Sequence, residues 1–77
     1  MPHLIVKLHS GRSEELKKRL AEAVTLAVTS TLGLSEATVS VALEEFSPER
    51  WAEDVYKPDI LEGKGTIYKQ PGYNPFR

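Results

Sequence analysis

The chain has no cysteine and only two histidines among its 77 residues. Without thiols it can form neither disulfides nor a thiolate metal site, and two histidines alone do not complete a tetrahedral zinc site. A domain of this size buries a small core, and many small domains are stabilised by such links or by association. We therefore predict no metal and expect self-association to supply further burial.

The sequence also has no excess of one charge sign and no long apolar run. Ten Lys and Arg residues stand against eleven Asp and Glu, so the net charge is −1, which gives no field for nucleic acid or an anionic membrane. No apolar run approaches the roughly 20 residues of a membrane span, and the amino terminus lacks a secretory signal pattern. We expect a cytoplasmic protein with no nucleic-acid or membrane partner.

Two short alternating segments flank one long amphipathic segment. Residues 3–9 and 38–46 alternate as strands do. Between them, Ser13 is a typical N-cap, Gly33 suits a helix end, and Glu14 and Glu15 favour the positive end of the helix dipole. Apolar residues at helical spacing predict a helix over about 13–32, with one stripe made of Leu16, Leu20, Ala23, Val24, Ala27, Val28 and Leu32.

A strand, a long helix and a second strand predict a β-α-β unit of the α+β class, with parallel strands and a right-handed crossover. One helix covers one face of such a two-stranded sheet, so the other face is expected to pack on a second copy of the chain. We predict one domain over 1–77, with the β-α-β core in 1–46 and a short helix and wrapping segment in 47–77.

The carboxyl-terminal part begins with another helix signal. Ser47 is placed as an N-cap, Pro48 suits the first helical position, and Pro58 is expected to stop the helix. The segment after it is rich in proline and aromatic residues. We expect it to wrap over its own subunit or a neighbour, with a short extended piece at 66–69.

Pro2 is the candidate catalytic residue. An initiator methionine is usually removed before a small residue, and removal of Met1 would leave Pro2 as a free secondary amine at the start of a strand. An α-amine has a pKa of about 7.7–8.0 and a prolyl amine a higher one, so a general base here needs a lowered pKa. The alternative reading of Pro2 is an ordinary start of an edge strand.

The combination of this proline, an arginine at the strand-to-helix turn and a β-α-β unit resembles the 4-oxalocrotonate tautomerase family. The resemblance runs across residues 1–50 and rests on the Pro2 strand, Gly11-Arg12-Ser13, the long helix and Val39-Ser40-Val41. The later stretches 47–51 and 69–73 resemble the longer branch of that family, which contains dimeric tautomerases acting on phenylpyruvate-like enols.

The resemblance implies a cofactor-free keto–enol tautomerase of small 2-oxo acids. Pro2 would act as general base and then acid, with Ile5 and Trp51 as apolar walls. Arg12 would bind a substrate carboxylate or the charge that develops on oxygen. The alternatives are a solvated turn residue for Arg12 and a core aromatic residue for Trp51.

Ser40 is where the chain departs from the family pattern. The best-known hexameric members carry a second arginine there, and a serine has neither its charge nor its reach. The departure argues against a dicarboxylate such as 2-hydroxymuconate and favours a monocarboxylate with an apolar or aromatic tail. Ser40 is expected to bind substrate, the alternative being a small strand residue with no role.

Two other functions remain open from the sequence. The same proline could assist hydration or dehalogenation of an unsaturated acid, which needs a carboxylate such as Glu44, Glu45 or Asp54 to activate water. A non-catalytic interaction module is the other alternative, and a retained Met1 would favour it, because the Pro2 nitrogen would then be an amide. A dimer is the expected building block, and a hexamer of three dimers fits the family equally well.

Overall fold

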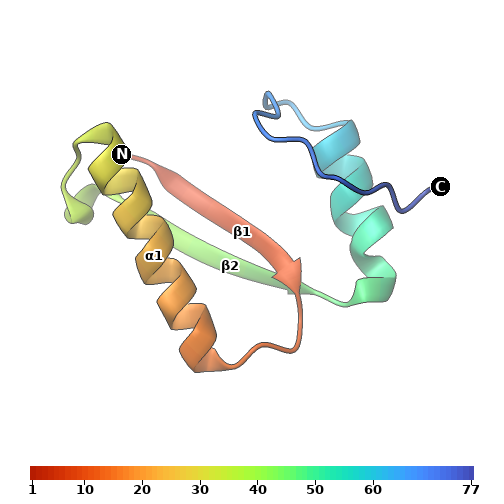
Figure 1. The fold of residues 1–77 in the computed structure, drawn as a ribbon, viewed down its shortest axis with the longest axis horizontal. Coiled ribbons are helices and arrows are strands. Elements are labelled where there is room, and N and C mark those ends of the chain that lie inside the picture. Colours follow the sequence, from red (N-terminus) through yellow and green to blue (C-terminus); the bar gives the residue numbers. More distant parts are fainter.

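The computed structural model describes residues 1–77. Two strands, one long helix and three shorter helical segments follow one another along the chain (Figure 1). In order they are β1 (His3–His9), α1 (Glu14–Leu32), the 3-10 turn η1 (Glu36–Thr38), β2 (Ser40–Phe46), the 3-10 turn η2 (Pro48–Arg50) and the π-helix η3 (Ala52–Leu61). This order confirms the predicted β-α-β unit followed by a second helix.

The two strands form a parallel sheet, as predicted. The register pairs His3 with Ser40 and continues in step to His9 opposite Phe46. Residues opposite one another therefore share a face of the sheet. Strand β2 begins two residues later than predicted, because Thr38 belongs to η1, whose first turn is capped by the Ser35 side chain.

Helix α1 has the predicted ends. The Ser13 side chain accepts a hydrogen bond from the Leu16 amide at 3.2 Å, and Gly33 adopts a left-handed φ of 68°. The predicted apolar stripe is only partly covered by the sheet. Its members Leu20, Val24 and Val28 are half-buried, whereas Leu16 is 49% exposed.

The prediction that Pro58 stops the second helix is wrong, because η3 contains Pro58 and continues to Leu61. The Lys57 carbonyl accepts from the Glu62 amide at 3.0 Å, a π-type step of five residues. This looser pattern accommodates a ring that would clash with the carbonyl four residues earlier in an α-helix. Ser47 occupies the predicted N-cap position of η2, but its side chain makes no capping hydrogen bond.

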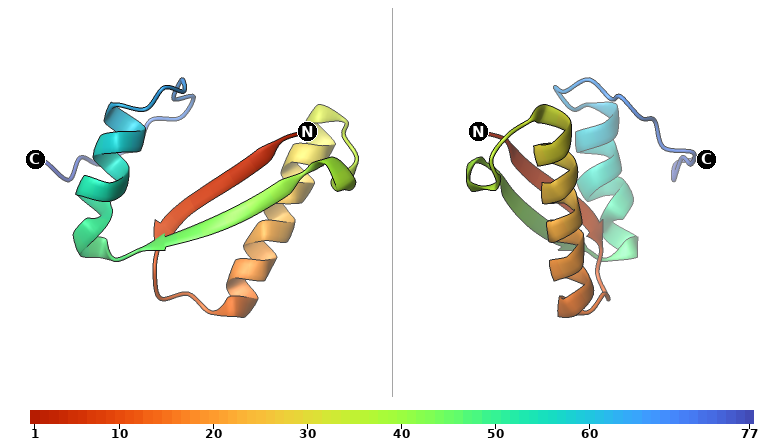
Figure 2. Two further views of the ribbon diagram at one scale, coloured as in Figure 1. Left: turned by 180° about the vertical axis from the view of Figure 1, so that it is seen from behind. Right: turned by 60° about the vertical axis from the view of Figure 1, so that its left-hand side comes forward.

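Helices α1 and η3 lie on opposite sides of the sheet (Figure 2). The Lys7 ammonium on β1 binds the Asp59 carboxylate of η3 and lies 5.8 Å from the centre of the Phe46 ring. The second face of the sheet is therefore partly covered within the chain, contrary to the expectation that a second copy alone covers it. Ile5 on that face stays 52% exposed.

The last residues wrap over η3 of the same chain. The Tyr56 hydroxyl donates to the Tyr73 carbonyl at 3.2 Å, and the rings of Tyr56 and Phe76 are 5.9 Å apart. The piece at 66–69, which was expected to be extended, belongs to no sheet, and the chain bends at 68–69.

The chain leaves an unusually large surface exposed for its size. Only Val55 and Tyr56 are buried, and the accessible surface is 5960 Å². A compact protein of 8.6 kDa exposes about 4,700 Å². The radius of gyration is 14.0 Å, against about 11.5 Å for a compact chain of this length. None of the helices is long and apolar enough to cross a membrane.

Candidate active site

Pro2 precedes β1 and is held to the start of β2. Its carbonyl accepts a hydrogen bond from the Ser40 amide at 3.1 Å, and its ring is half-buried. Met1 before it is fully exposed. The sheet thus fixes the Pro2 carbonyl. The Pro2 nitrogen is bonded to Met1, which is exposed.

Ser40 uses its side chain as well as its backbone at this end of the sheet. Its Oγ lies 2.7 Å from Nδ1 of His3, the residue directly opposite in the register. Both side chains are exposed. The hydroxyl that we predicted to face substrate is therefore engaged by a histidine next to Pro2.

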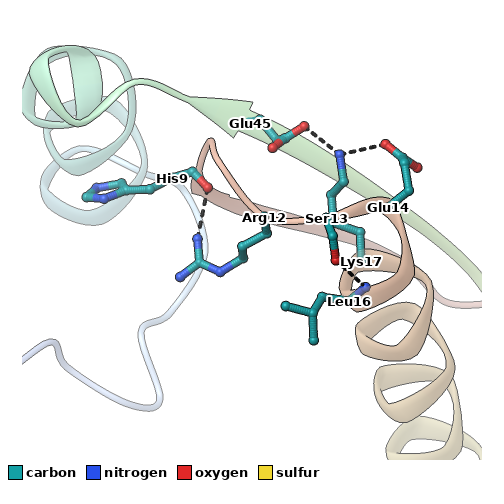
Figure 3. Close-up of polar contacts among 7 residues, drawn as sticks. All are labelled: His9, Arg12, Ser13, Glu14, Leu16, Lys17 and Glu45. Atoms are coloured by element: carbon teal, nitrogen blue, oxygen red, sulfur yellow. Dashed lines mark hydrogen bonds and ion pairs between the residues drawn. The ribbon is translucent and has the colours of Figure 1, made fainter.

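Arg12 lies in the turn between β1 and α1. One guanidinium nitrogen donates to the His9 carbonyl at 2.9 Å (Figure 3). No carboxylate pairs with this guanidinium, unlike Lys17 nearby, whose ammonium lies 2.8 Å from both Glu14 and Glu45. Arg12 therefore keeps N–H groups for an anion.

Trp51 connects η2 to η3 and is half-buried. Its indole nitrogen donates to the Tyr73 hydroxyl at 2.8 Å. The rings of His9 and Phe46 meet it edge-on, with centroids at 4.9 and 6.3 Å. Contacts from β1, β2 and the C-terminal segment thus hold this indole in one orientation.

One chain does not bring these residues together. Pro2 and Ser40 lie where the two strands begin, whereas Arg12 and Trp51 both contact His9, where β1 ends. Seven residue steps along a strand, at roughly 3.3 Å each, separate Pro2 from His9 by about 23 Å.

The surface hollows of the single chain do not connect the two ends either. They have volumes of about 280 to 550 Å³ and lie along α1, beside η3 and at the C-terminal segment. None is lined by a predicted site residue. No group of three or more His, Cys, Asp or Glu side chains gathers where a metal ion could bind.

The sequence reasoning missed two partners of the predicted residues. His3 stands in the alternating segment 3–9, and only the parallel pairing of the two strands places it opposite Ser40. Tyr73 was noted only within a resembling stretch, and no spacing in the sequence indicates its bond to Trp51.

Comparison with known proteins identifies a family that the chain matches. The family model described as "Tautomerase enzyme" matches residues 2–57. The chain is 42% identical over 73 residues to "Probable tautomerase" of Xylella fastidiosa, covering 95% of this chain and 89% of that protein. It is 43% identical over 76 residues to "Tautomerase PptA" of Pectobacterium atrosepticum, covering 96% and 99%.

The length of the matched region distinguishes a shorter relative from the longer branch of the family. The "2-hydroxymuconate tautomerase" of Bacillus subtilis is 42% identical over 52 residues, covering 68% of this chain and 84% of that protein. The match to "Tautomerase PptA" extends instead over nearly the whole chain, including the C-terminal segment that wraps η3. The predicted resemblance to the longer branch is confirmed.

Proposed function

Because the chain belongs to the tautomerase family of enzymes, we propose that it is a cofactor-free keto–enol tautomerase of small 2-oxo acids with Pro2 as its acid–base group. The observation that carries the proposal is the family match, which begins at Pro2 itself. The strand bond from Ser40 supports it, because it fixes the residue whose nitrogen would do the chemistry.

The proposed reaction moves one proton and uses no other reagent. The neutral Pro2 nitrogen takes the proton from the enol hydroxyl, and the electron pair forms the new carbonyl. The protonated nitrogen then gives that proton to the neighbouring carbon. A nearby guanidinium and apolar walls favour the neutral amine and stabilise the charge that develops on oxygen.

We propose that a second copy of the chain completes this site. Arg12 and Trp51 both contact His9, which lies about 23 Å from Pro2 along the strand, so those of another copy are needed beside Pro2. The chain also exposes about 1,300 Å² more than a compact protein of its mass. A standard interface covers about 800 Å² per partner, so one dimer interface would cover more than half of this excess, and a hexamer of three dimers would cover more of it.

The proposed substrate is a monocarboxylate with an apolar or aromatic tail. Ser40 supplies no second cation, and the Trp51 ring is a flat apolar surface held in place. The three carboxylates considered for hydration all lie beside cations: Glu45 lies 2.8 Å from Lys17, Asp54 lies 2.7 Å from Arg50, and Glu44 lies 4.0 Å from Lys7. The tautomerase is therefore favoured over the hydratase, and a location in the cytoplasm stays a prediction.

The test is the ketonisation of phenylenolpyruvate, followed by ultraviolet absorbance. The protein is first shown by intact mass to begin at Pro2 and is compared with Pro2→Ala. We expect a rate well above that of buffer, and its loss in the variant. Equal rates for both proteins, or none for either, would overturn the proposal and favour the non-catalytic module.

A further inference from the structure

The Pro2 end of the chain is almost free of charge. No lysine or arginine occurs between Leu20 and Glu49. This end is built from the starts of both strands, the last turns of α1 and η1 (Figure 1). Among the residues of these segments, His3 is the only basic side chain and Glu36 the only carboxylic acid.

His3 is held in one orientation by the residue that replaces the family's arginine. Its Nδ1 lies 2.7 Å from the Ser40 hydroxyl, and the Ser40 amide bonds the Pro2 carbonyl at 3.1 Å. Pro2, His3 and Ser40 are thus joined in one hydrogen-bonded group, which includes the residue that carries the proposed catalytic nitrogen. When the hydroxyl donates to Nδ1, the neutral ring carries its proton on Nε2 and presents it as a donor.

We propose that His3, oriented by Ser40, binds the substrate carboxylate beside Pro2 and so determines the preference for one carboxylate. The inference rests on the proposed function, because it assumes that substrate binds at Pro2. A 2-oxo acid bound at Pro2 places its carboxylate at this end of the chain. His3 is the only basic side chain that the same chain offers there. Arg12 of a second copy is then left for the oxygen on which charge develops.

The test compares an acid with its uncharged ester. Ketonisation of phenylenolpyruvate and of its methyl ester is measured for the wild type, His3→Phe, His3→Gln and Ser40→Ala. His3→Phe keeps a ring without a donor, whereas His3→Gln can place an amide N–H near the position of Nε2. We expect His3→Phe to raise KM for the acid about tenfold, the loss expected for a hydrogen bond to a charged group, with kcat and the ester little changed.

The other variants refine this expectation. His3→Gln should recover part of the loss, and Ser40→Ala should raise KM for the acid a few-fold, because the imidazole loses its orienting bond. Lys64→Gln, in the C-terminal segment, serves as the control and should leave the kinetics of both substrates unchanged. If His3→Phe fails to fold, as judged by circular dichroism, Ser40→Ala alone decides the question.

Two results would overturn the inference while leaving the proposed function intact. One is an equal effect of His3→Phe on acid and ester, which would indicate a structural role. The other is no effect on either substrate, with Pro2→Ala still inactive. If Pro2→Ala retained full activity on both substrates, the proposed function itself would fail, and the inference with it.

Discussion

At the scale of single residues, the Tyr73 hydroxyl supplies the one hydrogen bond of the Trp51 indole. The indole N–H donates to Tyr73 at 2.8 Å, and the Tyr73 carbonyl also accepts from Tyr56. The C-terminal segment therefore holds the indole in addition to the contacts from the two strands. This gives the segment a role in shaping the proposed substrate wall.

Tyr73→Phe should lower the free energy of unfolding by about 1 kcal/mol, since it removes the acceptor of the indole N–H. It should also raise KM for a 2-oxo acid with an aromatic tail, because the wall becomes less fixed. Urea unfolding and ketonisation kinetics measure the two effects. Tyr68→Phe is the matched control, since Tyr68 is 96% exposed and makes no hydrogen bond; equal behaviour of the two variants would refute the role of Tyr73.

At the scale of elements, α1 ends where the backbone turns left-handed at Gly33. Gly33→Ala should cost about 1 kcal/mol, because alanine disfavours a φ of 68°, although an added Cβ would meet no atom within 4 Å. Gly65→Ala is the control: it also has open space and lacks a positive φ. A comparable loss of thermal stability in both variants would show that the left-handed cap is not the cause.

The first turn of α1 gives a pH-dependent prediction. The hydrogen bond from Lys17 lowers the pKa of Glu14 below its ordinary 4.5, so the pair stabilises the fold above that pH. The contribution is lost as the pH falls through the lowered pKa of Glu14. Glu14→Gln should therefore reduce the urea midpoint at pH 7 and differ little from the wild type at pH 3.

Glu15→Gln is the control for Glu14→Gln. Both variants remove a negative charge from the first turn, but no ion pair joins Glu15 to another residue. The Glu14 variant should be the less stable of the two at pH 7, with the gap closing at pH 3. A gap that stays constant between the two pH values would contradict the account.

An element can be predicted from the sequence when its signals are local to that element. Both strands and α1 follow from local alternation, caps and apolar periodicity, which the structure retains. The stop at Pro58 failed because a π-type step accommodates a proline that an α-helix would exclude. The apolar stripe predicted on α1 includes Leu16 and Leu32, which are 49% and 61% exposed, and no local pattern separates a residue that faces the sheet from one left open.

The site was predictable only in part, for a similar reason. Pro2 and Arg12 follow from the resemblance, but their places at opposite ends of β1 follow from strand length and topology. Only the strand register, which places His3 opposite Ser40, reveals that these two residues are neighbours. The sequence around a residue does not show which residues lie beside it across a sheet or in another chain.

At the scale of the whole molecule, the account predicts that two inactive chains can restore each other. Pro2→Ala and Arg12→Ala are each expected to lose most activity. In a mixed dimer, one site would combine an intact Pro2 with an intact Arg12 from the other chain. After subunit exchange of equal amounts, about one quarter of all sites should be intact.

The mixture is assayed by ketonisation after dilution from mild denaturant. Activity near one quarter of the wild type supports a site shared between chains. Activity that never exceeds the sum of the separate variants, in a mixture shown to contain mixed dimers, would place Pro2 and Arg12 in separate sites or in one chain.

The most direct measurement concerns the Pro2 nitrogen and changes no side chain. The protein is made with a removable amino-terminal extension, and ketonisation of phenylenolpyruvate is measured before and after cleavage to a chain that begins at Pro2. An amide nitrogen cannot accept the proton, so we predict almost no activity before cleavage and full activity after it. Equal activity in the two forms would contradict the account.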